Sequence, residues 1–219
     1  FGTLGLILSV SVRLHPLPVA TATALGISAD PERLAGAART LAAAPLELEA
    51  LDVAWRGGRG GILAQCGGAQ APRRAQRIAA LMREAGLDGV QIELEDAELW
   101  ARQRAGQRSA GRALVRIAAR PSALAQVLRA ADACAGTLVG RIALGQSFLE
   151  LDPDALPQLA EHLPDHAISV LLDAPPGMRE AVDPWAAAQP DATLELMRRV
   201  KARFDPPQAC NPGVFVGGI

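Results

Sequence analysis

The side chains with the greatest chemical potential in this sequence are three histidines, His15, His162 and His166, and three cysteines. His162 and His166 are four residues apart, but Pro164 lies between them and interrupts a helix. They therefore cannot occupy consecutive turns of one helix, as a metal-binding pair would. Because no cysteine or carboxylate pattern joins the histidines, the sequence predicts no metal site.

The cysteines, Cys66, Cys134 and Cys210, are odd in number and far apart in the sequence. This pattern argues against a disulfide framework and favours a reducing compartment. Cys134 falls on the apolar side of a predicted helix and Cys66 ends a predicted strand, so both are interpreted as structural. Cys210 lies in a loop of more functional character, but small-residue packing is the favoured interpretation there too.

Four carboxylates fall close together, at Glu93, Glu95, Asp96 and Glu98. A pair of them could perform acid–base chemistry. However, the first two alternate with Ile92 and Leu94, which is typical of a strand with one solvated face. We therefore interpret the cluster as a solvated face.

The glycine clusters WRGGRGG (55–61) and CGG (66–68) do not match a phosphate-binding loop. Such a loop needs a lysine after its last glycine, and the only lysine here is Lys201. Both clusters are interpreted as tight turns.

The overall composition excludes several functional classes. The formal net charge is −1, which argues against electrostatic binding to nucleic acid or to anionic membranes. The longest apolar run, residues 4–10, is far shorter than the roughly 20 residues that a transmembrane helix needs. No basic segment precedes it, so a signal peptide is not expected.

Segments with the periodicity of strands and helices alternate along the chain. We predict strands at 21–28, 46–54, 62–66 and 89–95, with one helix after the N-cap Asp30 and another that starts at Pro72. A second set has strands at 112–119, 137–143, 147–151 and 166–173, with helices after Ser122 and Asp152. The predicted fold is α+β: two ferredoxin-like β-α-β-β-α-β units with antiparallel sheets flanked by helices. The side chains expected to be buried are Leu34, Leu41, Ile78, Met82, Leu124, Val127, Leu128, Leu156, Leu159 and Leu163.

The first residues, FGTLGLILSVSVRLHPLP, resemble the segment G-[ST]-x-G-[ILV]-[ILV]…[RK]-[LV]-x-P-x-P of the vanillyl-alcohol oxidase / p-cresol methylhydroxylase superfamily of flavoproteins. In that family the segment is the last strand of the FAD-binding domain. One departure is Leu8, where the family usually has Thr or Ser. The last residues, VKARFDPPQACNPGVFV (200–216), resemble the family's K-x-x-[FL]-D-P…N-P-G tail, with Cys210 in place of an aliphatic or aromatic residue.

Within the family, ELWARQR (98–104) followed by ALVRIAARPSAL (113–124) is similar to the FAD-binding subunit of bacterial glycolate oxidase. The resemblance implies that residues 1–18 are the last strand of an FAD-binding domain missing here, and that residues 175–219 are a tail that returns to that domain. Between them, residues 19–96 and 112–174 are two α+β units, and residues 97–111 connect them. It also implies that residues 1–14 form a strand, which in this chain pairs with the tail near 214–216, pairs with another copy, or is disordered.

The resemblance implies contacts to FAD in the full-length protein from Gly2, Thr3, Gly5, Leu6, Ile7 and Asn211. It also implies a small 2-hydroxy acid as substrate. The carboxylate of such an acid suits Arg102, Arg104 and Arg108, with a solvated polar loop as the alternative. It names no catalytic residue.

The implied partners are a second flavoprotein subunit and an iron–sulfur subunit. The implied location is the bacterial cytoplasm, with peripheral attachment to the inner membrane through those partners as a second option. We expect this chain alone to bind no flavin and to be inactive. The alternative is a non-enzymatic double ferredoxin-like module that binds a ligand or a protein.

Overall fold

The computed structural model describes residues 2–109, 111–179, 184–185 and 191–219. The chain divides into two compact units, Leu17–Pro184, which contains the sheet, and Phe1–Pro16 with Trp185–Ile219. The finer domain boundaries drawn from the sequence stay predictions. The helices and strands are β1 (Thr21–Ser28), α1 (Pro31–Ala43), β2 (Leu48–Arg56), β3 (Arg59–Gly67), α2 (Ala71–Glu84), β4 (Asp88–Glu93), α3 (Ala97–Ala105), β5 (Ala113–Ala118), α4 (Leu124–Ala133), β6 (Thr137–Arg141), β7 (Gln146–Leu151), α5 (Leu156–His162), β8 (Ile168–Asp173), α6 (Pro176–Arg179) and α7 (Asp191–Phe204).

The larger unit is built on one open sheet of eight strands in the order β4-β1-β3-β2-β6-β7-β5-β8, and every pairing is antiparallel. The first four strands have the ferredoxin-like order, and the last four have the same order reversed. The predicted α+β class is therefore confirmed. The two predicted units share one sheet, because β2 pairs with β6 from Asp52↔Arg141 to Arg56↔Thr137.

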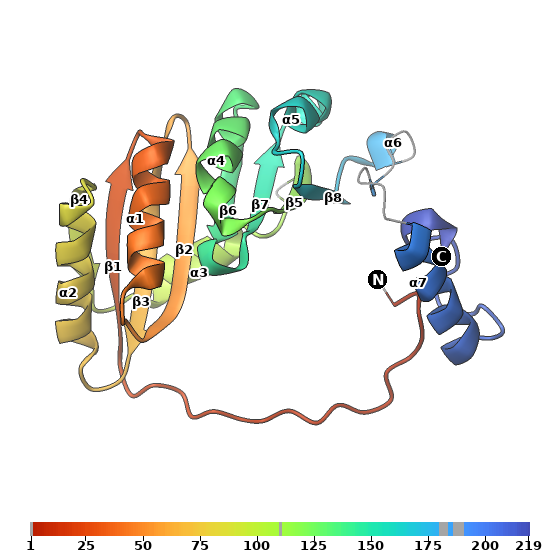
Figure 1. Ribbon diagram of the computed structural model, residues 1–219, viewed down its shortest axis with the longest axis horizontal. Coiled ribbons are helices and arrows are strands. Elements are labelled where there is room, and N and C mark those ends of the chain that lie inside the picture. Colours follow the sequence, from red (N-terminus) through yellow and green to blue (C-terminus); the bar gives the residue numbers. More distant parts are fainter. Residues whose placement is uncertain (1, 110, 180–183, 186–190) are drawn as a thin grey trace. The chain divides into compact units, whose positions relative to one another are not determined.

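Helices α1, α2, α4 and α5 cover one face of the sheet, and α3 crosses the other (Figure 1). The helix-covered face holds the hydrophobic core, to which each buried aliphatic side chain contributes about 1.5–3 kcal/mol. Of the predicted core residues, Leu156 and Leu163 are half-buried, and the other eight are buried: Leu34, Leu41, Ile78, Met82, Leu124, Val127, Leu128 and Leu159.

The helix starts follow the sequence signals in most cases. Asp30 caps α1 by accepting a hydrogen bond from the backbone N–H of Glu32 at 2.9 Å. The prediction that Ser122 caps the next helix is wrong, because Ser122 lies inside a 3₁₀ turn, Pro121–Ala123, that leads into α4, and the residue at the N-cap of α4 is Ala123. Asp152 caps a similar 3₁₀ turn that leads into α5.

The smaller unit contains α7, which spans Asp191–Phe204. Residues 2–20 form no strand, so the predicted pairing with the tail does not occur in the part of the chain that the structure describes. Pairing in a longer protein stays a prediction. In the described ranges, no helix has the length and apolar character needed to cross a bilayer.

Candidate functional site

A buried lysine holds the two ends of the chain together within the smaller unit. The ammonium of Lys201 donates hydrogen bonds to the carbonyl of Thr3 at 2.6 Å, to the carbonyl of Cys210 at 3.0 Å and to Asp205 Oδ2 at 3.0 Å. An ammonium has three donors, and all three are used here. Segments up to 198 residues apart in the sequence are thereby held around one side chain.

Asp205 organises the tail that follows α7. Its carboxylate accepts the backbone N–H groups of Ala209 and Cys210, each at 2.9 Å, in addition to the Lys201 ammonium. The hydrogen bond from Cys210 and the contact with Lys201 hold the pKa of Asp205 below its ordinary value, despite the opposing effect of burial. The residues between Asp205 and Asn211 are therefore fixed as a compact loop.

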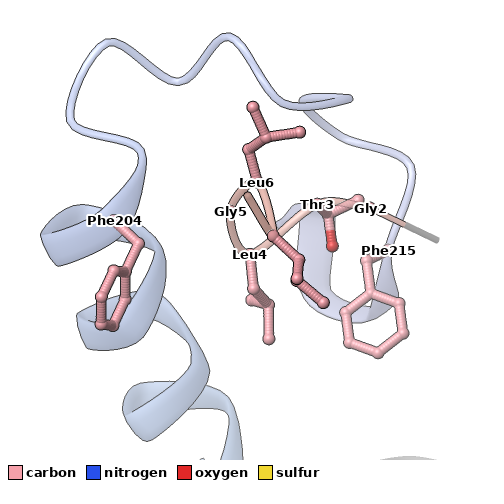
Figure 2. Close-up of a pocket in the computed structure, with 8 residues that line it drawn as sticks. Gly2, Thr3, Leu4, Gly5, Leu6, Phe204 and Phe215 are labelled. Carbon is pink, nitrogen blue, oxygen red and sulfur yellow. The ribbon is translucent and has the colours of Figure 1, made fainter. Parts of the chain in front are cut away.

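A pocket of about 490 Å³ lies beside this cluster (Figure 2), lined by Gly2, Thr3, Leu4, Gly5, Leu6, Ile7, Phe204 and Phe215. Figure 2 shows the N-terminal segment between Phe204 of α7 and Phe215 of the tail. Five of the six predicted cofactor residues line the pocket. The sixth, Asn211, faces Gly2, because a Cβ on Gly2 would lie 3.4 Å from Asn211 Nδ2. Sequence reasoning matched Lys201 and Phe204 to the tail motif without giving them a role, and it gave Phe215 none.

The chemistry of this pocket fits one edge of a flavin. Its lining combines the main chain of residues 2–5 with aliphatic and aromatic side chains, which suits the flat, largely apolar edge of a ring system. Its lining residues include no cation, and the nearby Lys201 has no donor left for a phosphate. The residues here therefore suit only part of an FAD molecule, and their role as cofactor ligands stays a prediction.

The three arginines predicted to bind substrate do not gather in one place. Arg102 and Arg104 are both exposed on α3, and positions two apart lie on nearly opposite sides of a helix. Arg102 lines an apolar pocket on one side of α3, whereas Arg104 lines a polar pocket on the other. Arg108, also exposed, follows the helix and lines neither of these two pockets. Their role in binding a substrate stays a prediction.

Helix α3 is anchored to the sheet by a buried polar network. Asp96, which directly precedes α3 and is 4% exposed, accepts hydrogen bonds from Thr21 Oγ1 (2.8 Å), Thr23 Oγ1 (2.6 Å) and Gln65 Nε2 (2.9 Å). Trp100 Nε1 donates to Thr23 Oγ1 at 2.8 Å. Burial alone would raise the pKa of Asp96, but these hydrogen bonds, led by that from Thr23, hold it below its ordinary value.

This network corrects the interpretation of the acidic cluster. Glu95 and Glu98 are exposed as expected, but Asp96 is buried and hydrogen-bonded. The alternation that predicted a solvated face ends with β4 at Glu93. After it the chain turns to begin α3 across the open face of the sheet, which carries Asp96 inward.

The polar pocket beside α3, of about 500 Å³, combines a buried carboxyl with two guanidinium groups. Asp52 of β2 lies directly opposite Arg141 of β6 in the sheet register, and Arg104 reaches the same pocket from α3. Gln103 Nε2 donates to Asp52 Oδ2 at 3.1 Å and to the carbonyl of Val53 at 3.0 Å. Burial raises the pKa of Asp52, although the hydrogen bond from Gln103 and the charge of Arg141 oppose that effect. Sequence reasoning missed Asp52, Gln103 and Arg141.

Comparison with known proteins found no matching family model and no matching curated protein. Among solved structures, the chain is similar to a VAO-type flavoprotein from Myceliophthora thermophila C1, with 11% identity, a TM-score of 0.48, and coverage of 90% of this chain and 47% of that one. It is also similar to a xylooligosaccharide oxidase from the same organism, with 15% identity, a TM-score of 0.48, and coverage of 87% and 54%. The chain thus spans about half the length of these structures.

Proposed function

We propose that this chain is the substrate-side, C-terminal domain of a flavin-dependent 2-hydroxy-acid oxidoreductase subunit of the glycolate type. When bound, FAD would supply the redox chemistry by accepting a hydride from the acid. This chain would supply one edge of the flavin site and the side chains that hold the acid. The remaining flavin contacts would come from residues outside the printed sequence, so the chain is expected to be inactive alone.

One observation carries the proposal: Lys201 joins the two segments whose motifs resemble the flavoprotein family. The resemblance rests on residues 1–18 and 200–216, which are at opposite ends of the sequence. In the structure, Lys201 and Asp205 hold the glycine segment against the tail and leave a pocket lined by the main chain. Buried charged residues are costly unless they are well paired, so this arrangement indicates a positioned segment and not a loose terminus.

The polar pocket on the sheet supports the choice of an acid as substrate. Guanidinium groups are well suited to carboxylates because they present planar donors, and Arg104 and Arg141 line this pocket together. Of the three arginines expected from the sequence, Arg104 is therefore the one that the proposal retains for substrate binding.

In the proposed assembly, electrons leave through a second flavoprotein subunit and an iron–sulfur subunit to a membrane quinone. The assembly would lie in the cytoplasm, at the inner membrane through these partners. The experiment below distinguishes a catalytic subunit, which binds the reacting acid, from a subunit with a structural role in the assembly.

The test is to express the protein from the start codon of its own reading frame, and to record its visible spectrum before and after anaerobic addition of glycolate. We expect stoichiometric flavin that glycolate bleaches, and we expect no flavin on the 219-residue chain alone. Lys201→Met should lose flavin, whereas Arg39→Gln, an exposed change on α1, should keep it. A reading frame that begins at Phe1, or a flavin that no small 2-hydroxy acid reduces, would overturn the proposal.

The alternative, a binding module without enzymatic activity, is favoured by the same polar pocket taken alone. It predicts that small acids bind to the larger unit and that no length of the protein carries flavin. The spectrum of the longer protein therefore distinguishes the two.

A further inference from the structure

Asp52 presents one carboxylate oxygen to the polar pocket while the other is held in place. The residue is 6% exposed, and Gln103 donates to its Oδ2 at 3.1 Å. The same amide group of Gln103 donates to the carbonyl of Val53 at 3.0 Å, so the orientation of the amide is fixed. Asp52 Oδ1 has no hydrogen-bond partner among the described residues. Since no fully enclosed side-chain polar atom there lacks a partner, this oxygen must open into the pocket.

The charges around Asp52 make a site for an anion that also carries a donor. Arg141 stands opposite Asp52 across the β2–β6 pairing, and Arg104 approaches from α3. Neither arginine forms an ion pair within the part of the chain that the structure describes. Glu49 lies at the rim of the pocket, where its carboxylate sits over Gly67. Two cations are therefore available to a ligand next to one fixed acceptor.

These features select among small anions. A plain carboxylate would gain contacts with the arginines but would place its charge beside the Asp52 carboxylate without any compensating hydrogen bond. A carboxylate with a neighbouring hydroxyl group can instead donate that hydroxyl to Asp52 Oδ1. A hydrogen bond to a charged acceptor is among the stronger ones in proteins.

We propose that Asp52 recognises the hydroxyl group of a small hydroxy acid whose carboxylate is bound by Arg104 and Arg141, and that Gln103 is the positioning residue that aims Asp52. This inference rests on the proposed function, because it names the side chains that would bind the substrate of the proposed oxidoreductase. It concerns binding alone, so it can be tested without flavin.

The experiment is an NMR titration of the isotopically labelled 219-residue chain with glycolate and, separately, with acetate at neutral pH. Glycolate should bind at least about tenfold more tightly than acetate, as expected for one hydrogen bond to a charged acceptor. The shift changes should centre on β2, β6 and α3. Arg141→Gln should weaken both acids, and Arg39→Gln should weaken neither.

Asp52→Asn provides the sharper test. Its amide oxygen would take the hydrogen bond from Gln103, which turns the amide NH₂ toward the pocket and replaces an acceptor by a donor. The preference for glycolate over acetate should then fall toward one. Should this variant fail to fold, methoxyacetate on the unaltered chain replaces it, since methylation removes the donor and should abolish the preference.

Equal binding of glycolate and acetate, binding of neither, or shift changes elsewhere in the chain would overturn the inference. Those outcomes leave the flavin proposal to its own spectroscopic test. Conversely, a longer protein without flavin, together with a glycolate preference that depends on Asp52, would overturn the redox proposal and keep the binding site.

Discussion

Replacing Asp96 by Ala should destabilise the larger unit by removing the acceptor at the base of α3. Three donors lose their partner, and each hydrogen bond to a charged group contributes about 1.5–3 kcal/mol. Thr23 is fully buried, so its hydroxyl keeps only its contact with Trp100, whereas Thr21 and Gln65 are half-buried and can regain water. Removing the buried carboxylate also removes the cost of burying its charge, which offsets part of the lost stability. We therefore expect a cost of about 2–4 kcal/mol.

The assay is thermal unfolding followed by circular dichroism, with Glu95→Ala as the matched control because Glu95 is the exposed neighbour. A domain of this size loses about 2–4 °C of Tm per kcal/mol, so Asp96→Ala should melt about 5–15 °C lower and Glu95→Ala nearly unchanged. Because the pKa of Asp96 is lowered by folding, its contribution is present above the unfolded pKa and is lost as the pH falls through the folded pKa. The variant should therefore lose less stability in acid. Equal melting temperatures for the two variants would refute this account of α3.

Four further substitutions test other parts of the structure. Ala135 has a φ of +47° where α4 ends, so Ala135→Gly should raise the free energy of unfolding in urea by about 0.5–1 kcal/mol. Gly86 has a φ of +79° with open space around an added Cβ, so Gly86→Ala should lower the same free energy by about 1 kcal/mol through backbone strain alone. Burial raises the pKa of Asp52, so the chain should lose stability as the pH rises from the ordinary value of 3.8 through the folded pKa, and urea unfolding of Asp52→Asn should lack this loss. Lys201→Met should make residues 2–7 mobile on the nanosecond scale in ¹⁵N relaxation without changing the Tm of the larger unit; unchanged relaxation would show that Lys201 does not hold this segment.

The elements of the fold could be predicted from the sequence because their signals are local. Periodicity identified the strands and helices, and glycine identified the β2–β3 turn, where Gly57 and Gly58 have φ values of +57° and +73°. Gly86 likewise ends α2, with the N–H of Leu87 bonded to the carbonyl of Met82 at 3.0 Å. The capping error at Ser122 has a local cause too, since a proline-led 3₁₀ turn and a direct helix start share the same residue types.

The two sequence motifs that resemble the flavoprotein family mark the segments that line the pocket of the smaller unit, but the buried lysine that joins these segments carries no local signal. Lys201 lies on α7, whose other side chains are exposed or half-buried, and its burial is decided by a carbonyl near the other end of the chain. Asp96 was misassigned for a similar reason. Its partners, Thr21, Thr23 and Gln65, come from two strands far from it in the sequence.

The polar pocket beside α3, for which we propose an acid as ligand, depends on how the two ferredoxin-like units join. Asp52 belongs to the first unit and Arg141 to the second, and they meet only because β2 and β6 pair across the centre of the shared sheet. The sequence pattern predicts two separate sheets. That arrangement would leave β2 and β6 as edge strands with exposed hydrogen-bonding groups. Pairing these edges removes that liability and at the same time places an acidic and a basic side chain opposite each other on the one face that α3 only partly covers. The stability of the joined sheet and the chemistry of its open face thus have the same structural origin, which no single segment of the sequence contains.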